Sequence, residues 1–516
     1  MAYDYAPFPY VAPPGLIAPE PRHPVAIVGA GPIGLALAID LAQRGIKSVV
    51  LDDNNVVSVG SRAICWAKRT LEIFERLGVG DRMLEKGVTW TVGRLFHGTD
   101  EIYSFDLLPE DGHKYPAFVN LQQYYVEQFL VERAQDFPDL IDMRFLNKVT
   151  DHSDQGDHVT LNVETPDGAY QIEAEYYIAA DGAGSSTRKR MELPFHGQSF
   201  DEHFLIVDVE LPQSPFPTED PERWFWFAPP FHPGQSALLH KQPDNIYRID
   251  LQLGPNADPE LEASEEKVLA HIKAVIGEMD FRLDWMSVYK FRCAKLDRFV
   301  HDRIIFVGDS AHVVSPFGAR GGNGGIQDID NLGWKLAAVL RGKLTTLLDS
   351  YDAERRHGAA ENILNSSRAT NFMTPKSEIE TLFRNEALNL AGTHPFARKL
   401  INSGRLSTPC TLAGMTLQTG QHPLVGRCLI DLPIASGWLT ETITGDFTLL
   451  TLDNAPWPTT KGLLNYALPP GRLTADRYGT KGAFLIRPDG HICAYFSTPD
   501  VEAISDAMFR ANGGFS

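Results

Sequence analysis

The sequence has few cysteines, no excess of basic residues and no long apolar run, and each shortage excludes a class of protein. Its five cysteines include no C-x-x-C pair and no Cys/His spacing that suits a tetrahedral metal site. The 47 Lys plus Arg are outnumbered by 66 Asp plus Glu, and the net charge of -19 repels nucleic acids and anionic membranes. We therefore expect no metal and neither nucleic-acid nor membrane partners.

Two further absences concern location. No uncharged apolar run reaches membrane-spanning length, and the N-terminus lacks the basic start and apolar core of a secretory signal. Scattered thiols without obvious pairing suit a reducing compartment. These features predict a cytoplasmic protein.

The chain is long enough for two or three packed domains, since 43% of its 516 residues are hydrophobic and can bury several cores. Alternating strand-like and helical segments predict an α/β fold. The expected parts are a Pro-rich arm over 1–24, a discontinuous doubly wound domain over 25–190 and 296–375, an inserted mixed-sheet domain over 191–295 with parts of 90–120, a helical linker over 376–406 and a C-terminal domain over 407–516.

The first motif with chemical content is a glycine turn between a strand and a helix. In V-G-A-G-P-I-G, Gly29, Gly31 and Gly34 allow a tight turn, the close approach of a pyrophosphate and the packing of helix on strand. Free N–H groups at the helix N-terminus stabilise the phosphate charge. The second strand ends at Asp52 and Asp53, where a carboxylate can accept hydrogen bonds from the adenosine ribose. This βαβ unit predicts a Rossmann-like site for NAD or FAD.

A second motif, R-I-I-F-V-G-D-S-A-H-V-V-S-P over Arg303–Pro316, favours FAD. It places Asp309 at the C-terminal end of a buried strand, where a carboxylate can accept hydrogen bonds from the ribityl hydroxyls that NAD lacks. Five glycines within 318–325 lead into a helix near Ile326, so free backbone N–H groups point at the bound group. A reduced flavin carries negative charge near its N1 atom, which such a helix N-terminus suits.

A third segment, A-D-G-A-G-S-S-T-R, supplies Asp181, Gly182, Ser185 and Arg188 after another buried strand. Together and in this order, the three motifs resemble those of the FAD-dependent aromatic hydroxylases typified by para-hydroxybenzoate hydroxylase, and most of all the branch around 3-(3-hydroxyphenyl)propionate hydroxylase. The resemblance covers about residues 24–400, and G-D-x-A-H-x-x-x-P is its most specific part. It implies non-covalent FAD, with NAD(P)H and dioxygen as cosubstrates.

The resemblance also implies which residues contact the FAD. The turn Gly29–Gly34 lines the pyrophosphate, and Asp52 binds the adenosine ribose. Val149 borders the adenine, Asp309 binds the ribityl chain and Asn323 holds the pyrimidine edge. The full set is Gly29, Gly31, Pro32, Ile33, Gly34, Asp52, Arg62, Gln123, Val149, Asp181, Gly308, Asp309, Pro316, Gly321, Asn323 and Gly324.

The implied reaction is hydroxylation of a small aromatic, phenolic substrate through a flavin C4a-hydroperoxide, as in the catabolism of aromatic compounds. Epoxidation, Baeyer–Villiger oxidation and antibiotic modification use the same intermediate and stay open, as does a flavoprotein that serves only as an interaction module. The C-terminal block resembles the thioredoxin-like domain of several such hydroxylases but lacks a redox cysteine pair. A homodimer is one alternative for the assembly.

Residues that act on the substrate are expected on the inserted sheet. The candidates for anchoring or activating it are Arg248, Tyr289, Tyr247 and Arg292. The resemblance also places Pro316 by the reacting edge of the flavin. The glycine loop departs from the family pattern, because Arg320 and Gly321 stand where Gln and Gly are common.

Two other features invite a functional interpretation. Trp224, Trp226 and Pro229 in W-F-W-F-A-P nearly reproduce the W-x-W-x-I-P signature of flavin-dependent halogenases, but Ala228 replaces the Ile. The glycine loop resembles that of the hydroxylases, so we expect this aromatic pair to form a strand face that covers the substrate. His312 in D-S-A-H is expected to support the flavin domain rather than act as a base.

Overall fold

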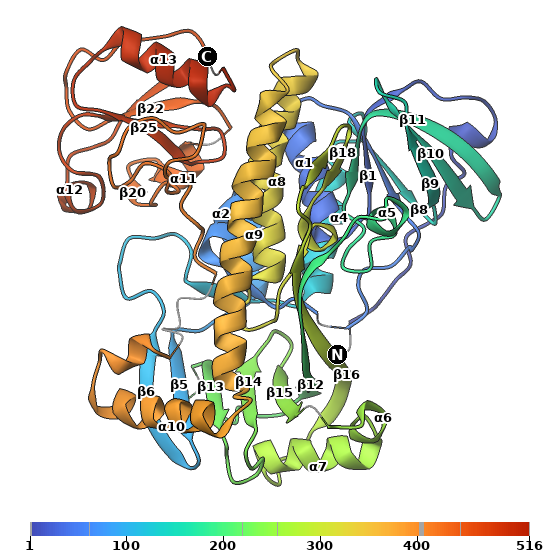
Figure 1. Cartoon of the computed structure of the whole chain (residues 1–516), viewed down its shortest axis with the longest axis vertical. Helices are drawn as coiled ribbons and strands as arrows, with labels where there is room; N and C mark the ends of the chain where they lie inside the picture. The colour runs from blue at the N-terminus through green and yellow to red at the C-terminus, as the bar shows by residue number, and fades with distance from the viewer. Residues whose placement is uncertain are drawn as a thin grey trace.

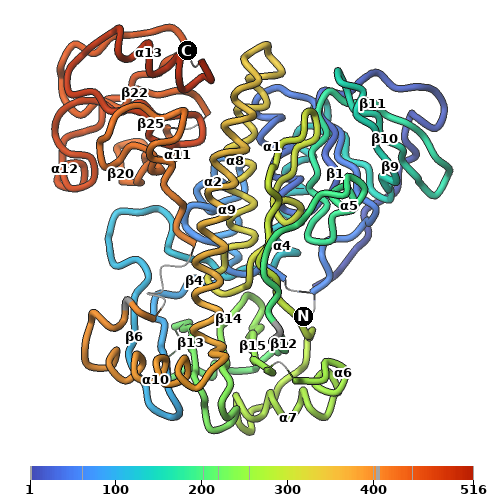
Figure 2. Tube along the Cα trace, in the orientation of Figure 1, coloured from blue at the N-terminus to red at the C-terminus, as the bar shows by residue number. Residues whose placement is uncertain are grey.

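The computed structural model describes residues 3–60, 62–218, 220–254, 256–401, 407–443 and 445–514. Figure 1 shows a parallel sheet with helices, an antiparallel sheet below it, and a C-terminal unit beside the long helices α8 (Gly321–Leu340) and α9 (Thr346–Met373). In Figure 2 the N-terminal end lies between the two large sheets, whereas the C-terminal end lies on the side of the C-terminal unit toward α9, where the Thr346 hydroxyl donates to the Gly513 carbonyl.

The first large sheet is built around the predicted βαβ unit. Its strand order is β17-β18-β11-β1-β2-β8, with β10 and β9 added beside β11. The bounds are β1 (His23–Val28), β2 (Ser48–Asp52), β8 (Ile141–Phe145), β9 (Lys148–Asp154), β10 (Val159–Thr165), β11 (Gly168–Ala179), β17 (Val300–His301) and β18 (Ile304–Phe306). Its central strands pair in parallel. Parallel neighbours need a crossover, which α1 (Pro32–Gln43) supplies between β1 and β2.

Helix α1 is buried on almost every side, because α8 and α4 (Gln123–Ala134) cover it opposite the sheet. A small sheet nearby consists of β3 (Cys65–Ala67), β4 (Val88–Thr89) and β7 (Phe118–Asn120). The remaining helices of this part are α2 (Lys68–Leu77), α3 (Gly80–Lys86) and α5 (Ser186–Arg190). The N-terminal arm contains η1 (Pro14–Leu16) and lies against this part, with the Phe8 ring stacked 4.6 Å from that of Phe145.

The second large sheet has the strand order β19-β16-β12-β15-β14-β13-β5-β6. Its bounds are β5 (Val92–His97), β6 (Asp100–Asp106), β12 (His196–Glu210), β13 (Glu222–Phe227), β14 (Ser236–Lys241), β15 (Ile246–Gly254), β16 (Arg282–Lys295) and β19 (His312–Val313). All its neighbours are antiparallel except the pair β13 and β5. One face packs on α7 (Glu265–Ile276), which follows the short α6 (Pro259–Glu262). The other faces the parallel sheet and its loops, where Arg248 donates to the Arg62 carbonyl.

Strand alternation decides which predicted residues reach that second face. Tyr247, Trp224 and Trp226 belong to the apolar core on the α7 side. The expectation that the tryptophan pair covers the substrate is therefore wrong, because side chains of a strand point alternately to opposite faces. The intervening Phe225 and Phe227 lie on the face toward the parallel sheet, where they join Phe317 in another core.

The C-terminal unit is a four-stranded sheet in the order β23-β22-β24-β25 with helices around it. Its bounds are β22 (Thr448–Thr451), β23 (Leu464–Ala467), β24 (Ala483–Ile486), β25 (Ile492–Phe496), α11 (Leu439–Thr442), α12 (Arg472–Tyr478) and α13 (Val501–Ala511), with a separate pair β20 (Pro433–Ile434) and β21 (Gly437–Trp438). Strands β24 and β25 form the predicted hairpin. Before this unit, α10 (Glu378–Thr393) packs on β6.

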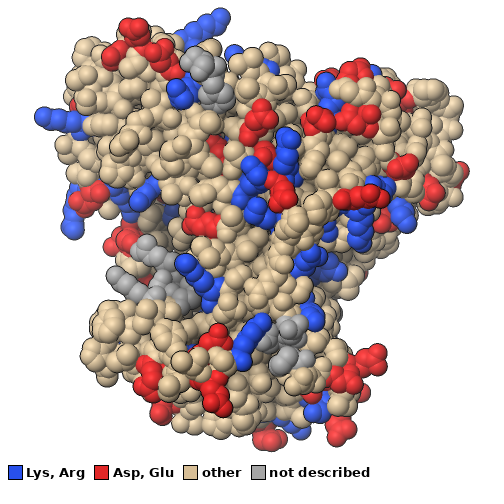
Figure 3. Space-filling view, in the orientation of Figure 1, with Lys and Arg blue, Asp and Glu red and all other residues tan. Residues whose placement is uncertain are grey.

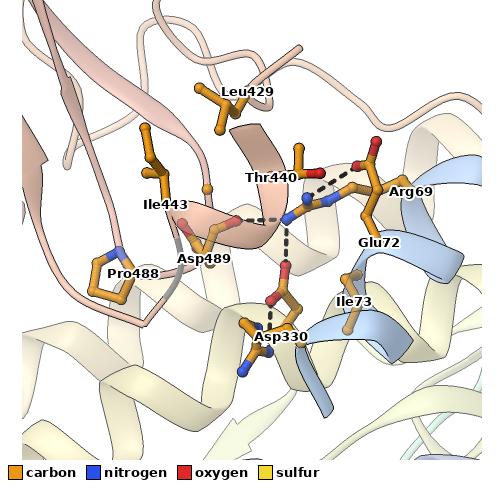
Figure 4. A pocket seen from close by; sticks show the side chains of 11 residues that line it. Arg69, Glu72, Ile73, Asp330, Leu429, Thr440, Ile443, Pro488 and Asp489 are labelled. Atoms are coloured by element: carbon orange, nitrogen blue, oxygen red, sulfur yellow. Dashed lines mark hydrogen bonds and ion pairs between the residues drawn. The ribbon is translucent and has the colours of Figure 1, made fainter. Parts of the chain in front are cut away.

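Apolar and ionic contacts both fix the C-terminal unit to the helices of the first part. Trp334 of α8 and Leu347 of α9 share a core with Leu485 and Ile504. Figure 4 shows the polar pocket beside this joint, in which the Arg69 guanidinium donates to the Asp330 carboxylate at 2.8 Å and to the Asp489 carbonyl at 2.7 Å. Because internal partners occupy these groups, we interpret this pocket as part of the docking interface.

The charged side chains follow no simple pattern on the face drawn in Figure 3, where Lys and Arg lie interspersed with Asp and Glu. None of the helices in the described parts of the chain combines the length and the apolarity needed to span a membrane.

Candidate active site

The predicted glycine turn joins β1 to α1, and its three glycines have different surroundings. Gly29 has φ +112°, and a Cβ there would overlap the carbonyl oxygen of Ala180. A Cβ on Gly34 would overlap the carbonyl oxygen of Gly29, whereas one on Gly31 would meet nothing within 4 Å. Gly31 is the N-cap of α1, where no side chain caps the helix and Pro32 is the first helical residue. Open space therefore lies before free N–H groups, which fits a pyrophosphate.

Asp52 lies at the end of β2, beside this turn. Its Oδ2 accepts the Ala30 N–H at 2.6 Å, and its Oδ1 accepts the Asn54 N–H at 2.8 Å. Burial raises the pKa of Asp52, although these two donors lower it. Each carboxylate oxygen has a second lone pair, so the position suits a ribose hydroxyl.

Asp309 lies in η2 (Gly308–Ser310), directly after β18. Among the described residues, none donates a hydrogen bond to its carboxylate. Burial raises the pKa of Asp309, although His312, Arg188 and Arg62 lower it. Asp309 is half-buried, and a hydroxyl-bearing ligand would supply the hydrogen-bond donor that its carboxylate lacks within the described residues. The residues present therefore fit the ribityl chain of FAD.

The N-terminus of α8 is tied to β3 by a side chain that was predicted to hold the flavin. The Asn323 Oδ1 accepts the Ala67 N–H at 2.8 Å, and its Nδ2 donates to the Cys65 carbonyl at 2.8 Å. Its amide is thus occupied within the protein, and a flavin contact at this position has to use the main chain. Arg320 is the N-cap and gives no side-chain cap to the helix, so N–H groups of Gly321 and its neighbours stay available.

His312 has the supporting role expected from the sequence. Its Nε2 lies 2.7 Å from Oδ2 of Asp328, whose Oδ1 accepts from Arg355 at 2.7 Å. Asp328 also accepts the Gly308 N–H at 3.0 Å, so the triad holds the turn that carries Asp309. Burial alone would raise the pKa of Asp328, but His312 and Arg355 outweigh it and lower that pKa.

The third motif is held together from within. The Asp181 Oδ2 accepts from the N–H and hydroxyl of Thr187 at 2.9 and 2.8 Å, while its Oδ1 is buried without a partner among the described residues. Arg188 donates to the Ser310 carbonyl at 2.8 Å and to the Ala183 carbonyl at 2.6 Å. The third motif is thereby joined to the loop of Asp309.

The remaining predicted cofactor residues lie on three elements. Gln123 of α4 accepts the Ala63 N–H at 3.1 Å and donates to the Ser58 hydroxyl at 2.9 Å. Arg62, in the loop that Gln123 holds, is exposed, whereas Val149 of β9 is buried. Gln123 therefore positions the loop of Arg62.

A row of polar side chains crosses the inner face of the antiparallel sheet, by which we mean the face toward the parallel sheet. Asp208, Arg248, His240 and Arg223 are cross-strand neighbours on β12, β15, β14 and β13, and all four are buried. Arg248 donates Nε to Asp208 at 2.9 Å and Nη1 to the Arg62 carbonyl at 3.3 Å. Since it binds Asp208 through two nitrogens, Arg248 fits a positioning role better than that of a base.

The other predicted catalytic residues lie further along this face. Tyr289 is half-buried on β16 opposite Phe204, and Pro316 is exposed in the loop before α8. The Phe317 ring lies 5.3 Å from that of Phe204 and 6.3 Å from that of Phe291. These aromatics connect the inner face to the glycine loop. Arg292 is exposed and donates to a carbonyl of the 195 loop.

The sequence interpretation missed His240, Asp250 and Arg223. A signal was present, because Arg248, Asp250 and Gln252 alternate with apolar residues along β15. Polar residues at every second position of a central strand indicate a polar face turned toward something other than an apolar core.

Comparisons with known proteins agree with this arrangement. A family described as FAD binding domain matches residues 22–366. The 12-dehydrotetracycline 5-monooxygenase/anhydrotetracycline 6-monooxygenase of Streptomyces rimosus subsp. rimosus is 29% identical over 94% of this chain and 98% of that protein. The 3-(3-hydroxy-phenyl)propionate/3-hydroxycinnamic acid hydroxylase of Escherichia coli K12 is 28% identical over 85% of this chain and 78% of that protein.

A solved structure shares the fold over almost the whole chain. The flavin-dependent monooxygenase PieE, in complex with FAD and substrate, superposes with a TM-score of 0.78 at 21% identity. The match covers 96% of this chain and 100% of that one. The architecture described above is therefore one that is found in a flavin monooxygenase.

Proposed function

The chain belongs to the family described as FAD binding domain, and from this premise we infer that it is an FAD-dependent monooxygenase that hydroxylates an aromatic substrate. NAD(P)H and dioxygen are its cosubstrates. When bound, FAD accepts a hydride from NAD(P)H and activates dioxygen so that one oxygen atom reaches the substrate. The chain has to hold the cofactor, orient the substrate and exclude water.

The observation that carries this proposal is the meeting of three elements at Ile33, in the first turn of α1. A Cβ on Gly308 or on Gly325 would lie within about 3 Å of the Ile33 side chain. The pyrophosphate turn, the loop of Asp309 and the N-terminus of α8 therefore converge on one residue. An elongated dinucleotide with a ribityl chain fits such a line of donors and acceptors.

The individual cofactor contacts are part of the proposal. We assign the pyrophosphate to the turn 29–34, the ribose to Asp52 and the ribityl chain to Asp309. The other proposed contacts are Arg62, Gln123, Val149, Asp181, Gly308, Pro316, Gly321, Gly324 and the main chain of Asn323. Open space at Gly31 and the unpartnered carboxylate of Asp309 support the assignment.

For the substrate we propose a small phenol, as expected in aromatic catabolism. The ring would lie near Phe204, Phe291 and Phe317, with Tyr289 and Pro316 close to the reacting position. Aromatic side chains pack well on the faces and edges of an aromatic ligand. The hydroxylase from Escherichia coli, whose name includes 3-(3-hydroxy-phenyl)propionate, supports a phenolic acid.

A second candidate is the hydroxylation of a larger polycyclic aromatic, as in antibiotic modification. The observation that favours it is the match with the anhydrotetracycline monooxygenase, which extends over 94% of this chain and includes the C-terminal unit. Product analysis with anhydrotetracycline and with 3-(3-hydroxyphenyl)propionate separates the two candidates.

Domain limits and location are further parts of the proposal. We retain the five parts expected from the sequence, with 25–190 and 296–375 as the FAD-binding domain and 191–295 as the substrate domain. A four-stranded sheet with flanking helices supports a thioredoxin-like unit over 407–516. All five cysteines are free, which supports a cytoplasmic location. The homodimer is likewise kept as part of the proposal.

We predict that the substrate accelerates flavin reduction. The described residues form one sheet of the dinucleotide-binding type, which is assigned to FAD, so NAD(P)H is expected to bind transiently. A ring beside Phe317 would shift the populations of the glycine loop next to it and with them the access of the nicotinamide. Stopped-flow reduction should be at least about 10-fold faster with the hydroxylated phenol, equivalent to about 1.4 kcal/mol of barrier.

The control is 3-phenylpropionate, which has the shape of the phenolic acid but no hydroxyl group. Equal reduction rates with and without a phenol that is demonstrably hydroxylated would refute substrate gating and leave the monooxygenase assignment intact.

A further inference from the structure

Three buried polar atoms on the inner face of the antiparallel sheet have no hydrogen-bond partner among the described residues. They are Nε of Arg223, Nε2 of His240 and Oδ1 of Asp250. The strands that carry them, β13, β14 and β15, are neighbours, and Arg223 stands directly opposite His240. Each unpartnered buried atom costs about 1–3 kcal/mol. Three such atoms in one place indicate that a ligand supplies their partners.

This face looks toward the proposed flavin site. Arg223 Nη1 lies 3.4 Å from Sγ of Cys65, and the Cys65 carbonyl accepts from Asn323 at the N-terminus of α8. Asp250 has Leu238 and Ile206 as cross-strand neighbours. Its side chain stays 23% exposed although β15 is a central strand. A ligand can therefore reach this carboxylate, which lies between apolar side chains.

The tautomer of His240 follows from the hydrogen bonds around Asn120. The Trp90 indole N–H donates to Oδ1 of Asn120 at 3.1 Å, which fixes the orientation of that amide. Nδ2 of Asn120 then donates to Nδ1 of His240 at 3.4 Å and to the Lys241 carbonyl at 2.8 Å. The proton of the neutral imidazole is thus on Nε2. This N–H is a free donor 3.9 Å from Oδ2 of Asp250.

Asp250 is poised to accept a proton near neutral pH. Burial raises its pKa to about 6, although Arg248 and Arg223 lower it and Asp208 raises it. Burial, with the same two arginines, lowers the pKa of His240, so this imidazole is neutral at pH 7. The charged and titratable groups facing Asp250 from the sheet and from β3 are Arg223, Arg248, Asp208, His240 and Cys65.

We propose that Asp250 is the base that takes the proton from the hydroxyl group of a phenolic substrate, and that His240 and Arg223 hold the phenolate oxygen that remains. The phenol O–H bond breaks, its proton forms a bond to Oδ2 of Asp250, because Oδ1 is enclosed, and the electron pair stays on the phenolate oxygen. Arg248 neutralises Asp208, so the new anion faces the positive charge of Arg223. Electron density from the phenolate enriches the ring carbons ortho and para to it. The assignment rests on the proposed function.

The test uses FAD-loaded enzyme with 3-(3-hydroxyphenyl)propionate, its ring-fluorinated forms and anhydrotetracycline. For wild type, kcat/KM should fall about tenfold per pH unit below about pH 6, because only ionised Asp250 accepts the proton. Asp250→Asn should lower kcat at pH 7 about 100-fold and remove this acid limb. Fluorination makes the phenol more acidic, so it should restore the variant much more than it changes wild type.

Control measurements separate a base from a structural residue. Asp280→Asn makes the same change at an exposed site after α7 and should leave the pH profile unchanged. FAD occupancy of Asp250→Asn should equal that of wild type. Arg223→Gln should raise the KM of the phenol by a larger factor than it raises the Ki of 3-phenylpropionate, an inhibitor that lacks the hydroxyl group.

Failure of the base assignment and failure of the proposed function give different results. Hydroxylation in Asp250→Asn with the acid limb intact, or without rescue by the fluorinated phenols, would overturn the base assignment while the monooxygenase function stands. If no probe is hydroxylated by FAD-loaded wild type, the proposed function fails and the assignment of Asp250 falls with it.

Discussion

Replacing Gly31 by leucine should yield a folded protein that has lost its FAD. The Cβ at this position would project into open space before the N-terminus of α1, where the pyrophosphate is proposed to lie. A branched side chain there would displace the phosphates from the free N–H groups without disturbing a protein neighbour. We expect flavin content after desalting to fall below about a tenth of the wild-type value, since loss of these charge-assisted hydrogen bonds costs several kcal/mol.

Two glycines serve as controls. Gly471→Leu changes another helix N-cap without positive φ, in the C-terminal unit, where a Cβ would also have room; it should keep full FAD content. Gly34→Ala should instead reduce the yield of folded protein, because its Cβ would overlap the carbonyl oxygen of Gly29. Full FAD occupancy in Gly31→Leu would contradict the placement of the pyrophosphate.

Replacing Glu354 by leucine should destabilise the joint between α9 and the C-terminal unit by about 3–5 kcal/mol. The buried carboxylate of Glu354 accepts from Arg487 at 2.6 and 3.0 Å and from Lys335 at 2.7 Å. Its removal leaves two buried cations, of which Arg487 retains Asp489 as its only charged partner among the described residues and Lys335 retains Asn331. The unfolding transition in denaturant, followed at pH 7, measures the loss.

The pH of that measurement matters. Burial alone would raise the pKa of Glu354, but Arg487 and Lys335 outweigh it and hold the pKa well below its ordinary value. The stabilising contribution is therefore complete above the unfolded value of about 4.3 and is lost as the pH falls through the folded value. Glu386→Gln, at an exposed position of α10, should change stability by less than about 0.5 kcal/mol. A comparable effect of both changes would refute the buried network.

The parts of the site that sequence could predict depend on local backbone requirements. Gly29 has a positive φ, and Gly34 has no room for a Cβ beside the Gly29 carbonyl, so the spacing of these glycines is enough to predict the turn. Asp309 follows a short buried strand, and the glycines after it open a helix. Each of these motifs lies within about twenty residues of chain. The structure brings the glycine turn, the loop of Asp309 and the N-terminus of α8 together at Ile33.

The remaining parts depend on partners that are distant in sequence. The tryptophans of β13 lie on the face that packs against α7, and the spacing of Trp224 and Trp226 alone did not reveal which face of the sheet they occupy. The side-chain amide of Asn323 forms its hydrogen bonds with the main chain of β3, which lies about 250 residues earlier in the chain. Asp250 gains its significance from residues of three other strands, which periodicity alone does not bring together.

The most direct test of the central claim follows the oxygen atom. FAD-loaded enzyme is given NAD(P)H and an aromatic probe, 3-(3-hydroxyphenyl)propionate or anhydrotetracycline, under ¹⁸O-labelled dioxygen, and the product is analysed by mass spectrometry. We predict a hydroxylated product that contains one labelled oxygen atom and forms with about one NAD(P)H consumed. Consumption of NAD(P)H that yields hydrogen peroxide and no labelled product from any phenolic or polycyclic probe would contradict the assignment of this chain as a monooxygenase.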